Sequence, residues 1–306
     1  MPPRSPLPQR HGLDAAWLRT PRDGGWAVMR DHLVDRLPYD AEPRVDEMIA
    51  EGRFVDDRGT TITAATPYAP NVFVWFHRDL PVETVVAAGV PVLYRDERIV
   101  VVDKPHFLST IPRGQHVMQS VVVRMRDKLG LPELGAAHRL DRMTAGVLLL
   151  TTERRWRAAY QTLFERRGVA KVYEAIAPVG PLRVGETRVV RSHLRKDRGV
   201  LQAYEVPDAA PNAETVVELL ATRGLLGRYR LTPRTGRTHQ LRLHLNALGV
   251  PIANDPLYPE LLGAPLGDHT RPLQLLARTL QFTDPVDGTE HDFTSRRELA
   301  VWSTAG

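Results

Sequence analysis

An aspartate between two arginines is the residue of this sequence best placed to do chemistry. In the segment AAHRLDRMTAGVLLLTTE, residues 136–153, Asp141 lies between Arg139 and Arg142 and directly before an apolar run. A turn there can hold the carboxylate at the rim of a buried strand. Neighbouring arginines favour its ionised form, which is the form a nucleophile needs. Charge spacing alone favours a simpler alternative, an ordinary surface ion pair or a turn aspartate.

A second polar group falls on a predicted helix. The pattern predicts a helix over residues 238–248, in which three leucines form one face. His239, Arg242 and Asn246 are spaced so that they share another side of this helix. His239 and His244 are five residues apart and lie on different faces, which argues against a shared metal ion. The sequence contains no zinc-like ligand spacing, so no metal site is predicted.

Strands must hold these groups in place. From about residue 90 the sequence alternates short β-branched runs with turns. The run GVLLLT at 146–151 is continuously apolar and suits a central strand buried on both faces. Residues 203–214 and 259–271 are rich in Pro, Gly, Ala and Asp and are predicted to be surface loops. The predicted strands are Val90–Tyr94, Arg98–Val102, Gly146–Thr151, Val172–Ala177, Thr215–Thr222 and Arg228–Thr232.

A helix is predicted directly after the central strand. Thr152 is a suitable cap for its start and Gly168 for its end. Its apolar residues recur at helical spacing and form one stripe, with arginines largely off it. The stripe consists of Trp156, Ala159, Tyr160, Leu163 and Phe164.

The N-terminal part reads as separate from the rest. Residues 1–12 are rich in proline and are predicted to be a flexible tail, and residues 13–82 a small unit. Within that unit Ala41–Ala50 looks helical and NVFVWF at 71–76 strand-like. The order of this helix, the segment EGRFVDDRGTTI and a closing strand is similar to the α-L RNA-binding domain. The alternative is a structural extension packed on the main domain.

Composition excludes several classes. Of the 306 residues, 42% are hydrophobic and 25% charged, which is typical of a folded protein and excludes disorder throughout. The absence of cysteine excludes disulfides, thiolate metal sites and a cysteine nucleophile. A net charge of +5 is compatible with a polyanionic partner or simply a soluble surface. No run approaches the ~18 apolar residues of a membrane helix, so a cytoplasmic protein without a membrane anchor is expected.

Familiar cofactor and hydrolase motifs are missing. The sequence lacks G-x-G-x-x-G, G-x-x-x-x-G-K-[ST], G-x-S-x-G and H-E-x-x-H. A glycoside hydrolase would use a pair of carboxylates, and no convincing second acid lies near Asp141 in the sequence.

The residues around Asp141 indicate a family. HRLDRMTAGVLLL closely resembles the signature of the RluA-like pseudouridine synthases, and four further segments follow in that family's order over about residues 90–290. These are VLYRDERIVVVDKP, KVYEAI, RLTPRTGRTHQLRLHLNALGVPIANDPLYP and RPLQLLARTLQFTDPVDG. The resemblance implies an α+β fold, with a mixed, mainly antiparallel β-sheet catalytic domain and flanking helices over 90–306. It implies an isomerase that converts uridine to pseudouridine in ribosomal or transfer RNA, without metal or organic cofactor. A monomer is the default expectation.

The resemblance also assigns catalytic roles. Asp141 matches the catalytic aspartate, acting as a nucleophile or through a glycal-like intermediate. Tyr173, in KVYEA, matches the tyrosine that packs against the target base and serves as general base. Arg242, in HQLRLH, matches the arginine that pairs with the catalytic aspartate, a role for which the guanidinium fork is suited. The simpler alternatives are a half-buried strand tyrosine and an exposed helix arginine.

Further residues are expected at the RNA. Uridine in folded RNA must be extruded before both its base and its sugar can be reached, and Arg139 matches the residue that fills the vacated space. His138 is expected to hold the loop or to be purely structural. Gly236, Arg237 and Thr238 resemble a phosphate contact at a helix N-terminus, and His239 beside them is also expected at the RNA.

Three positions depart from the family pattern. Ala145, Leu276 and Asn254 stand where the family more often has Ser, His and Gly. Leu276 is expected to alter packing near the base pocket, and Asn254 to alter a turn. A protein of another class, an RNA-binding factor that keeps the scaffold and has lost turnover, is the competing hypothesis.

Overall fold

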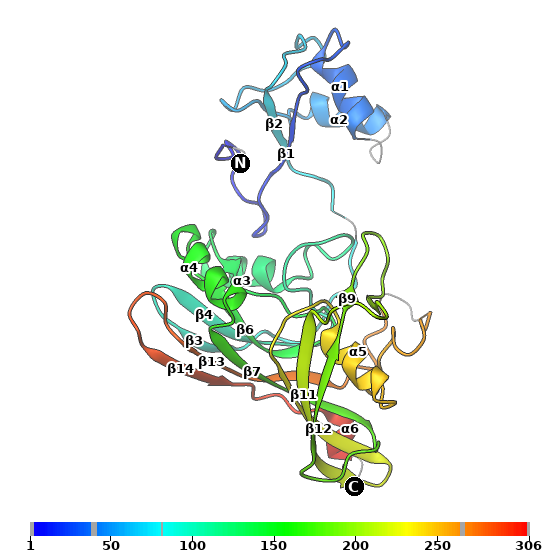
Figure 1. Ribbon diagram of the computed structural model, residues 1–306. Coiled ribbons are helices and arrows are strands. Elements are labelled where there is room, and N and C mark those ends of the chain that lie inside the picture. Colours follow the sequence, from blue (N-terminus) through cyan, green and yellow to red (C-terminus); the bar gives the residue numbers. More distant parts are fainter. Residues whose placement is uncertain (1–2, 38–41, 81, 264–266, 305–306) are drawn as a thin grey trace. The chain divides into compact units, whose positions relative to one another are not determined.

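The structure is a computed structural model that describes residues 3–37, 42–80, 82–263 and 267–304. It divides into two compact units, Met1–Val82 and Glu83–Gly306 (Figure 1). Each unit has hydrophobic clusters of its own, and each is described separately below.

The N-terminal unit pairs two short strands with two helices. Strands β1 (Ala16–Arg19) and β2 (Phe73–Phe76) are antiparallel, and helices α1 (Met29–Arg36) and α2 (Glu42–Ala50) contribute to the same core. The predicted helix is confirmed from Glu42 onward, since residue 41 lies outside the described residues, and the predicted strand is confirmed only from Phe73. The likeness to an α-L domain stays a prediction.

The predicted N-terminal tail makes contacts where it is described. Leu7 packs against a cluster of Ala15, Val55 and Trp75, and the backbones of Arg10 and Leu13 exchange two hydrogen bonds of 3.0 and 2.9 Å.

The larger unit is built on a ten-stranded sheet. Eight of its strands follow the order β3-β4-β6-β13-β7-β12-β11-β8, while β14 pairs with β13 and β5 with β6. All pairs are antiparallel except that of β13 with β6. The predicted α+β fold with a mixed, mainly antiparallel sheet is therefore confirmed. The sheet strands are β3 (Val92–Arg95), β4 (Ile99–Lys104), β5 (Gly135–Ala136), β6 (Ala145–Thr151), β7 (Val169–Pro178), β8 (Thr187–Ser192), β11 (Ala213–Arg223), β12 (Leu226–Pro233), β13 (Leu275–Thr283) and β14 (Glu290–Thr294).

Short elements complete this unit. Strands β9 (Leu194–Arg195) and β10 (Tyr204–Glu205) form a separate ribbon, and the helices are α3 (Val121–Leu129), α4 (Arg154–Glu165), α5 (Gln240–Ala247) and α6 (Ala300–Thr304). The loop predicted over residues 203–214 is wrong in part, because β10 lies inside it and β11 begins at Ala213. None of the helices in the described ranges is both long and apolar enough to cross a membrane.

Alternating side chains divide the core. On β4, Val100 and Val102 pack with α3, whereas Ile99 and Val101 pack with Tyr160 of α4. Every residue of β6 is buried, as expected for a central strand with both faces covered. A further cluster joins β7, β11 and β12 to α5.

The helix ends differ from their predictions. Glu153, not Thr152, precedes α4, because the Thr152 hydroxyl donates hydrogen bonds to backbone carbonyls of residues 97 and 98. After α4 the left-handed conformation falls on Arg167, at φ +60°, rather than on Gly168. Helix α5 begins at Gln240, two residues later than predicted, and His239 before it has φ +57°.

Candidate active site

Asp141 lies in a tight turn that leads into the central strand β6. The Thr144 amide donates a hydrogen bond to the Asp141 carbonyl oxygen at 3.0 Å, which closes the turn. Asp141 itself is half-buried, and Thr144 is buried. The carboxylate therefore stands at the end of a fully buried strand, as predicted from the sequence.

Three side chains from one neighbouring segment hold this turn. Lys104 ends β4, is fully buried, and its Nζ donates to the carbonyl oxygens of Arg142 (3.1 Å), Leu108 (2.6 Å) and Pro105 (3.0 Å). The imidazole Nδ1 of His106 lies 2.6 Å from the carbonyl oxygen of Met143.

Thr110 completes the clamp. Its hydroxyl donates to the Leu140 carbonyl oxygen at 2.7 Å and accepts from the Leu140 amide at 3.1 Å. The backbone is thus fixed on both sides of Asp141 by buried Lys104 and Thr110 and by half-buried His106, and a buried hydrogen bond is costly to lose.

Strand register sets Tyr173 opposite the clamp. Lys104 pairs with Gly146, Gly146 with Ala277, and Ala277 with Tyr173, so the four residues form one row across β4, β6, β13 and β7. The two middle residues are small. Gly146 has φ +114°, and a Cβ there would collide with the Ala277 backbone, so only glycine allows this approach of β6 and β13. Tyr173 also borders both large hydrophobic clusters of the unit.

The charge of Asp141 acts on the titratable groups around it. Burial raises the pKa of Tyr173 well above its ordinary value, and the Asp141 carboxylate raises it further. The pKa of Tyr258 is raised to about 12, chiefly by burial, with a smaller contribution from Asp141. Burial lowers the pKa of Lys104, and Asp141 opposes that shift. Tyr173 is therefore a neutral phenol at neutral pH, and the Asp141 carboxylate is close enough to raise its pKa.

Arg242 has a different partner from the one expected. It is buried, and its Nε donates to Asp255 Oδ2 at 2.7 Å while Nη2 bonds Oδ1, a bidentate ion pair with both side chains out of water. Among the described residues Arg242 forms no ion pair with Asp141, so the expectation of that direct pair is wrong for this structure. The expectation of an exposed helix arginine is wrong as well. Its guanidinium also lies over the Tyr258 ring, 5.2 Å from the centroid.

His239 connects this ion pair to Asp141. Its Nδ1 lies 2.9 Å from the Tyr258 hydroxyl. Burial lowers its pKa from the ordinary value, Asp141 raises it and Arg242 lowers it. Asp141 and Arg242 thus act on the same imidazole although they do not pair.

The loop before α5 is organised by Gln240. Its Oε1 accepts hydrogen bonds from the Thr235 hydroxyl (2.7 Å) and the Arg237 amide (3.0 Å), and its Nε2 donates to strand β11. The side chains of Arg237 and Thr238 are exposed, as an RNA contact requires. The Arg237 amide is already used inside the loop, and the Arg237 Nε donates to the Asn212 carbonyl oxygen at 3.3 Å.

His138 and Arg139 behave differently from each other. The Leu149 amide donates to His138 Nε2 at 3.1 Å, and the ring stacks on Phe164 with centroids 4.3 Å apart. Burial lowers the pKa of His138 to about 3. It is therefore neutral, and its Nε2 and its ring face hold the loop, which favours the structural interpretation over RNA binding. Arg139 is exposed and forms no ion pair with any described residue.

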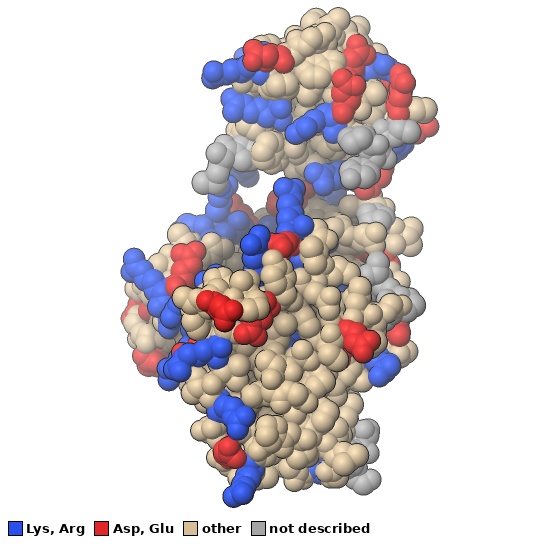
Figure 2. All heavy atoms as spheres, turned by 45° about the vertical axis from the view of Figure 1, so that its right-hand side comes forward, with Lys and Arg blue, Asp and Glu red and all other residues tan. Residues whose placement is uncertain are grey.

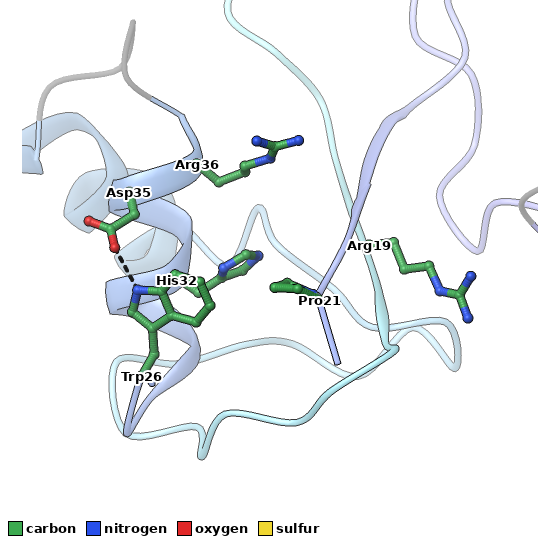
Figure 3. Close-up of a pocket in the computed structure, with 6 residues that line it drawn as sticks. All are labelled: Arg19, Pro21, Trp26, His32, Asp35 and Arg36. Carbon is green, nitrogen blue, oxygen red and sulfur yellow. Dashed lines mark hydrogen bonds between the residues drawn. The ribbon is translucent and has the colours of Figure 1, made fainter. Parts of the chain in front are cut away.

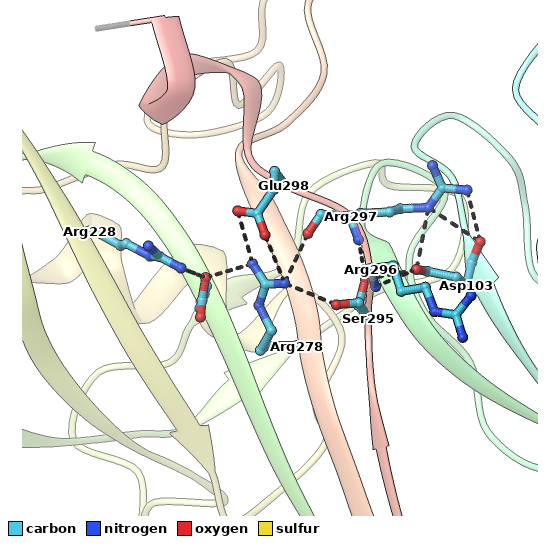
Figure 4. A network of polar contacts seen from close by, with 8 residues as sticks. Asp103, Arg228, Arg278, Ser295, Arg296, Arg297 and Glu298 are labelled. Atoms are coloured by element: carbon cyan, nitrogen blue, oxygen red, sulfur yellow. Dashed lines mark hydrogen bonds and ion pairs between the residues drawn. The ribbon is translucent and has the colours of Figure 1, made fainter. Parts of the chain in front are cut away.

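A polar network lies behind this row. Alternation along β4 and β7 turns Asp103 and Glu174 to the opposite face from Lys104 and Tyr173. Asp103 is buried and accepts from the Ser295 hydroxyl and the Arg296 amide, both at 2.8 Å (Figure 4).

Arginines extend the network to the middle strands. Burial alone would raise the pKa of Glu174, but the guanidinium groups of Arg278 and Arg228 bring it below its ordinary value. Arg278 also donates to the carbonyl oxygens of Ser295 and Arg297 (Figure 4). The strands that carry Lys104 and Tyr173 are thus fixed from behind by side chains one position away.

Charges of both signs are mixed on the surface of the larger unit. On the face drawn in Figure 2, the basic side chains of residues 83–306 are interspersed with acidic ones. Within the described part of the chain, no cluster of three or more His, Asp or Glu side chains could hold a metal ion.

Comparison with known proteins identifies the family. Residues 98–247 match the model of the RNA pseudouridylate synthase family. The dual-specificity RNA pseudouridine synthase RluA of Haemophilus ducreyi is 34% identical over 202 residues, which cover 63% of this chain and 87% of that protein. The chain belongs to the RluA-like family of pseudouridine synthases. Its predicted membership is confirmed.

Other relatives are longer or more distant. The human pseudouridylate synthase RPUSD2 is 34% identical over 194 residues, covering 62% of this chain and only 34% of that protein. The solved structure of human RNA pseudouridylate synthase domain containing 4 has a TM-score of 0.53 at 26% identity, covering 68% of this chain and 88% of that one. The chain thus spans about a third of the human relative's length.

The positions that depart from the family pattern have structural explanations. Leu276 is fully buried with Ala145, Ile176 and Leu299 on the rear of the sheet, so its expected place near the base pocket is wrong. Asn254 has φ +60°, a conformation that asparagine tolerates better than most residues. It can therefore stand where the family more often has glycine.

Several site residues carried no clear sequence signal. Lys104 falls inside the family-like segment VLYRDERIVVVDKP, but a charged residue at the end of an apolar strand indicates no role by itself. His106 and Thr110 follow it without any pattern. Gln240 and Asp255 fall inside the family-like segment at residues 230–259, but the sequence assigns no role to either.

Proposed function

We propose that this protein isomerises uridine in RNA to pseudouridine, with Asp141 as the catalytic carboxylate. The observation that carries the proposal is the placement of Asp141. It stands in a turn clamped by Lys104, His106 and Thr110, and its charge acts on the Tyr173 phenol. Membership of the RluA-like family supports the same activity.

The carboxylate has two routes to the product. It can attack the nucleoside covalently, or it can promote cleavage of the glycosidic bond through a glycal-like intermediate. In both, uracil is freed, rotates and rejoins the sugar through carbon 5, and the proton on carbon 5 is lost. The uridine must first leave its stack, and we assign exposed Arg139 to the space it vacates.

Tyr173 is proposed to pack against the target base and to take part in loss of the carbon 5 proton. Its raised pKa means that it enters the reaction as a neutral phenol. A phenol in that state accepts a proton only if it passes its own proton on, and Asp141 is the nearby anion that favours such a transfer.

Arg242 is proposed to act through the groups it fixes. Its pair with Asp255 anchors helix α5, and its charge lies against Tyr258, whose hydroxyl contacts His239. In the proposed complex the exposed side chains of Arg237 and Thr238 contact phosphate. His239 lies beside them at the start of α5.

The substrate is proposed to be ribosomal or transfer RNA. One relative's name gives a transfer RNA position and another's the large ribosomal subunit. The reaction as proposed needs no cofactor. Binding should weaken steeply with salt, because arginines that face phosphates release condensed counterions.

The test uses RNA carrying tritium at carbon 5 of uridine. Wild-type protein should release tritium, Asp141→Asn should release none, and Asp127→Asn should match wild type because Asp127 is an exposed residue of α3. Equal release by wild type and Asp141→Asn would overturn the assignment of Asp141.

The same experiment separates the competing hypothesis. An RNA-binding factor without turnover would bind RNA and release no tritium from any cellular RNA. Mapping pseudouridine in RNA from cells with and without the gene would then identify the modified position, or show that none depends on this protein.

A further inference from the structure

A pocket in the N-terminal unit is separate from the site around Asp141. It encloses about 350 Å³ and lies between α1 and the end of β1 (Figure 3). This volume falls at the lower end of the range for small-molecule sites and accommodates one nucleotide. Its lining residues are Arg19, Pro21, Trp26, His32, Asp35 and Arg36.

The imidazole of His32 is the least explained group in the pocket. His32 is 2% exposed, and neither of its ring nitrogens has a hydrogen-bond partner among the described residues. Buried polar groups in folded proteins are nearly always paired, so two unpaired nitrogens on one buried ring point to a missing partner. Burial lowers the pKa of His32, so the ring is neutral and presents one donor and one acceptor.

The Trp26 ring provides a flat, fixed surface in the pocket. Trp26 is half-buried, and its indole nitrogen donates to Asp35 Oδ2 at 2.6 Å, which fixes the ring (Figure 3). The Trp26 and His32 rings meet edge to face with centroids 4.6 Å apart, and Tyr68 supports both. Bases of single-stranded nucleic acid stack on such aromatic surfaces.

Two cations flank this surface. Arg19 and Arg36 are exposed, and neither forms an ion pair with any described residue. Arg36 follows His32 by one helical turn, and Arg19 ends β1 on the other side of the pocket. Exposed guanidinium groups without a carboxylate partner are suited to phosphate oxygens. Asp35, also at the rim, already accepts the indole N–H.

We propose that this pocket binds one unpaired base of an RNA strand, with the base against Trp26 and His32 and the adjoining phosphates at Arg19 and Arg36. The inference rests on the proposed function in one respect, that the polymer is RNA. The pocket would then hold substrate RNA at a point other than the reacting uridine.

The test follows the indole N–H signal of Trp26 by NMR in the full-length protein, with Trp75 as a buried reference in the same unit. A single-stranded uridine hexamer should shift the Trp26 signal and leave Trp75 unchanged. Binding should weaken about tenfold with an abasic hexamer or in Trp26→Leu, because stacking is lost, and Trp26→Phe should restore most of it. Arg19→Gln with Arg36→Gln should weaken binding similarly, and Arg58→Gln, an exposed arginine outside the pocket, should not.

Three results would overturn the proposal. The first is an unmoved Trp26 signal. The second is an abasic hexamer that binds as tightly as the intact one, which would mean that charge alone accounts for the binding. The third is uridine monophosphate binding as tightly as the hexamer, which would indicate a free-nucleotide site.

Tritium release separates this proposal from the proposed function. Trp26→Leu should raise KM and leave kcat unchanged. If wild-type protein released no tritium, the function would fail while the binding result stood.

Discussion

Removing the charge of Asp255 should destabilise the larger unit strongly. The Arg242 and Asp255 side chains are 2% and 0% exposed, and Asp255 Oδ1 also accepts from the Leu257 and Tyr258 amides. Asp255→Asn leaves a buried guanidinium without a counter-charge, a change that costs about 3–5 kcal/mol in comparable buried pairs. For a unit of this size each kcal/mol corresponds to roughly 2–4 °C in Tm.

The assay is urea unfolding followed by far-UV circular dichroism. Asp197→Asn serves as the control, because it breaks an ion pair with Arg195 whose side chains are 63% and 40% exposed, and its midpoint should match wild type. The double variant Arg242→Met with Asp255→Asn should lose less stability than the sum of the single variants, since neither charge is then left alone. If Asp255→Asn unfolds at the same midpoint as Asp197→Asn, the pair does not stabilise the fold as argued.

Three further predictions concern the packing around the site. Burial lowers the pKa of His244 to about 4, so folding favours the neutral imidazole, and stability falls as the pH drops from the unfolded pKa near 6.5 toward 4. Between pH 7 and pH 5 the loss in unfolding free energy should therefore be about 2 kcal/mol smaller in His244→Gln than in wild type. Equal losses in the two proteins would refute this. Gly146→Ala should lower the unfolding free energy by about 3 kcal/mol or more, because the added Cβ meets the Ala277 backbone. The control Gly185→Ala, also at positive φ but with nothing within 4 Å of the added Cβ, should lower it by about 1 kcal/mol. Equal effects of the two variants in thermal unfolding would contradict the steric argument. Thr110→Val removes both hydrogen bonds to Leu140 and should lower kcat for tritium release about tenfold. Thr110→Ser keeps the hydroxyl, and its kcat should be near that of wild type. A wild-type kcat in Thr110→Val would show that the clamp is dispensable.

The sequence predicts the parts of this fold that depend on local pattern. The runs that became β4, β6 and β7 are apolar or β-branched, and the stripe of α4 has helical spacing, so each is recognisable without its neighbours. Helix α3 is not, because it begins with three valines, which favour a strand. Neither β8 nor β13 was predicted, because their assignment depends on pairing with distant strands.

Only part of the candidate site is predictable from the sequence. Asp141 and Tyr173 are predicted from the family-like segments around them, whereas the structure gives Arg242 a different partner from the predicted one. The contact of the Arg242 guanidinium with Asp255 depends on the path of the chain after residue 249. The clamp of Lys104, His106 and Thr110 binds backbone carbonyl groups. Every residue has such a group, so the residue types do not reveal the contacts.

The bond between Asp103 and Ser295 joins residues 192 positions apart. During synthesis on the ribosome, β4 is made long before the segment that supplies its hydrogen-bond donors. A nascent chain therefore contains Asp103 before the Ser295 hydroxyl and the Arg296 amide have been synthesised. A chain that ends before residue 295 would lack both of these donors to Asp103.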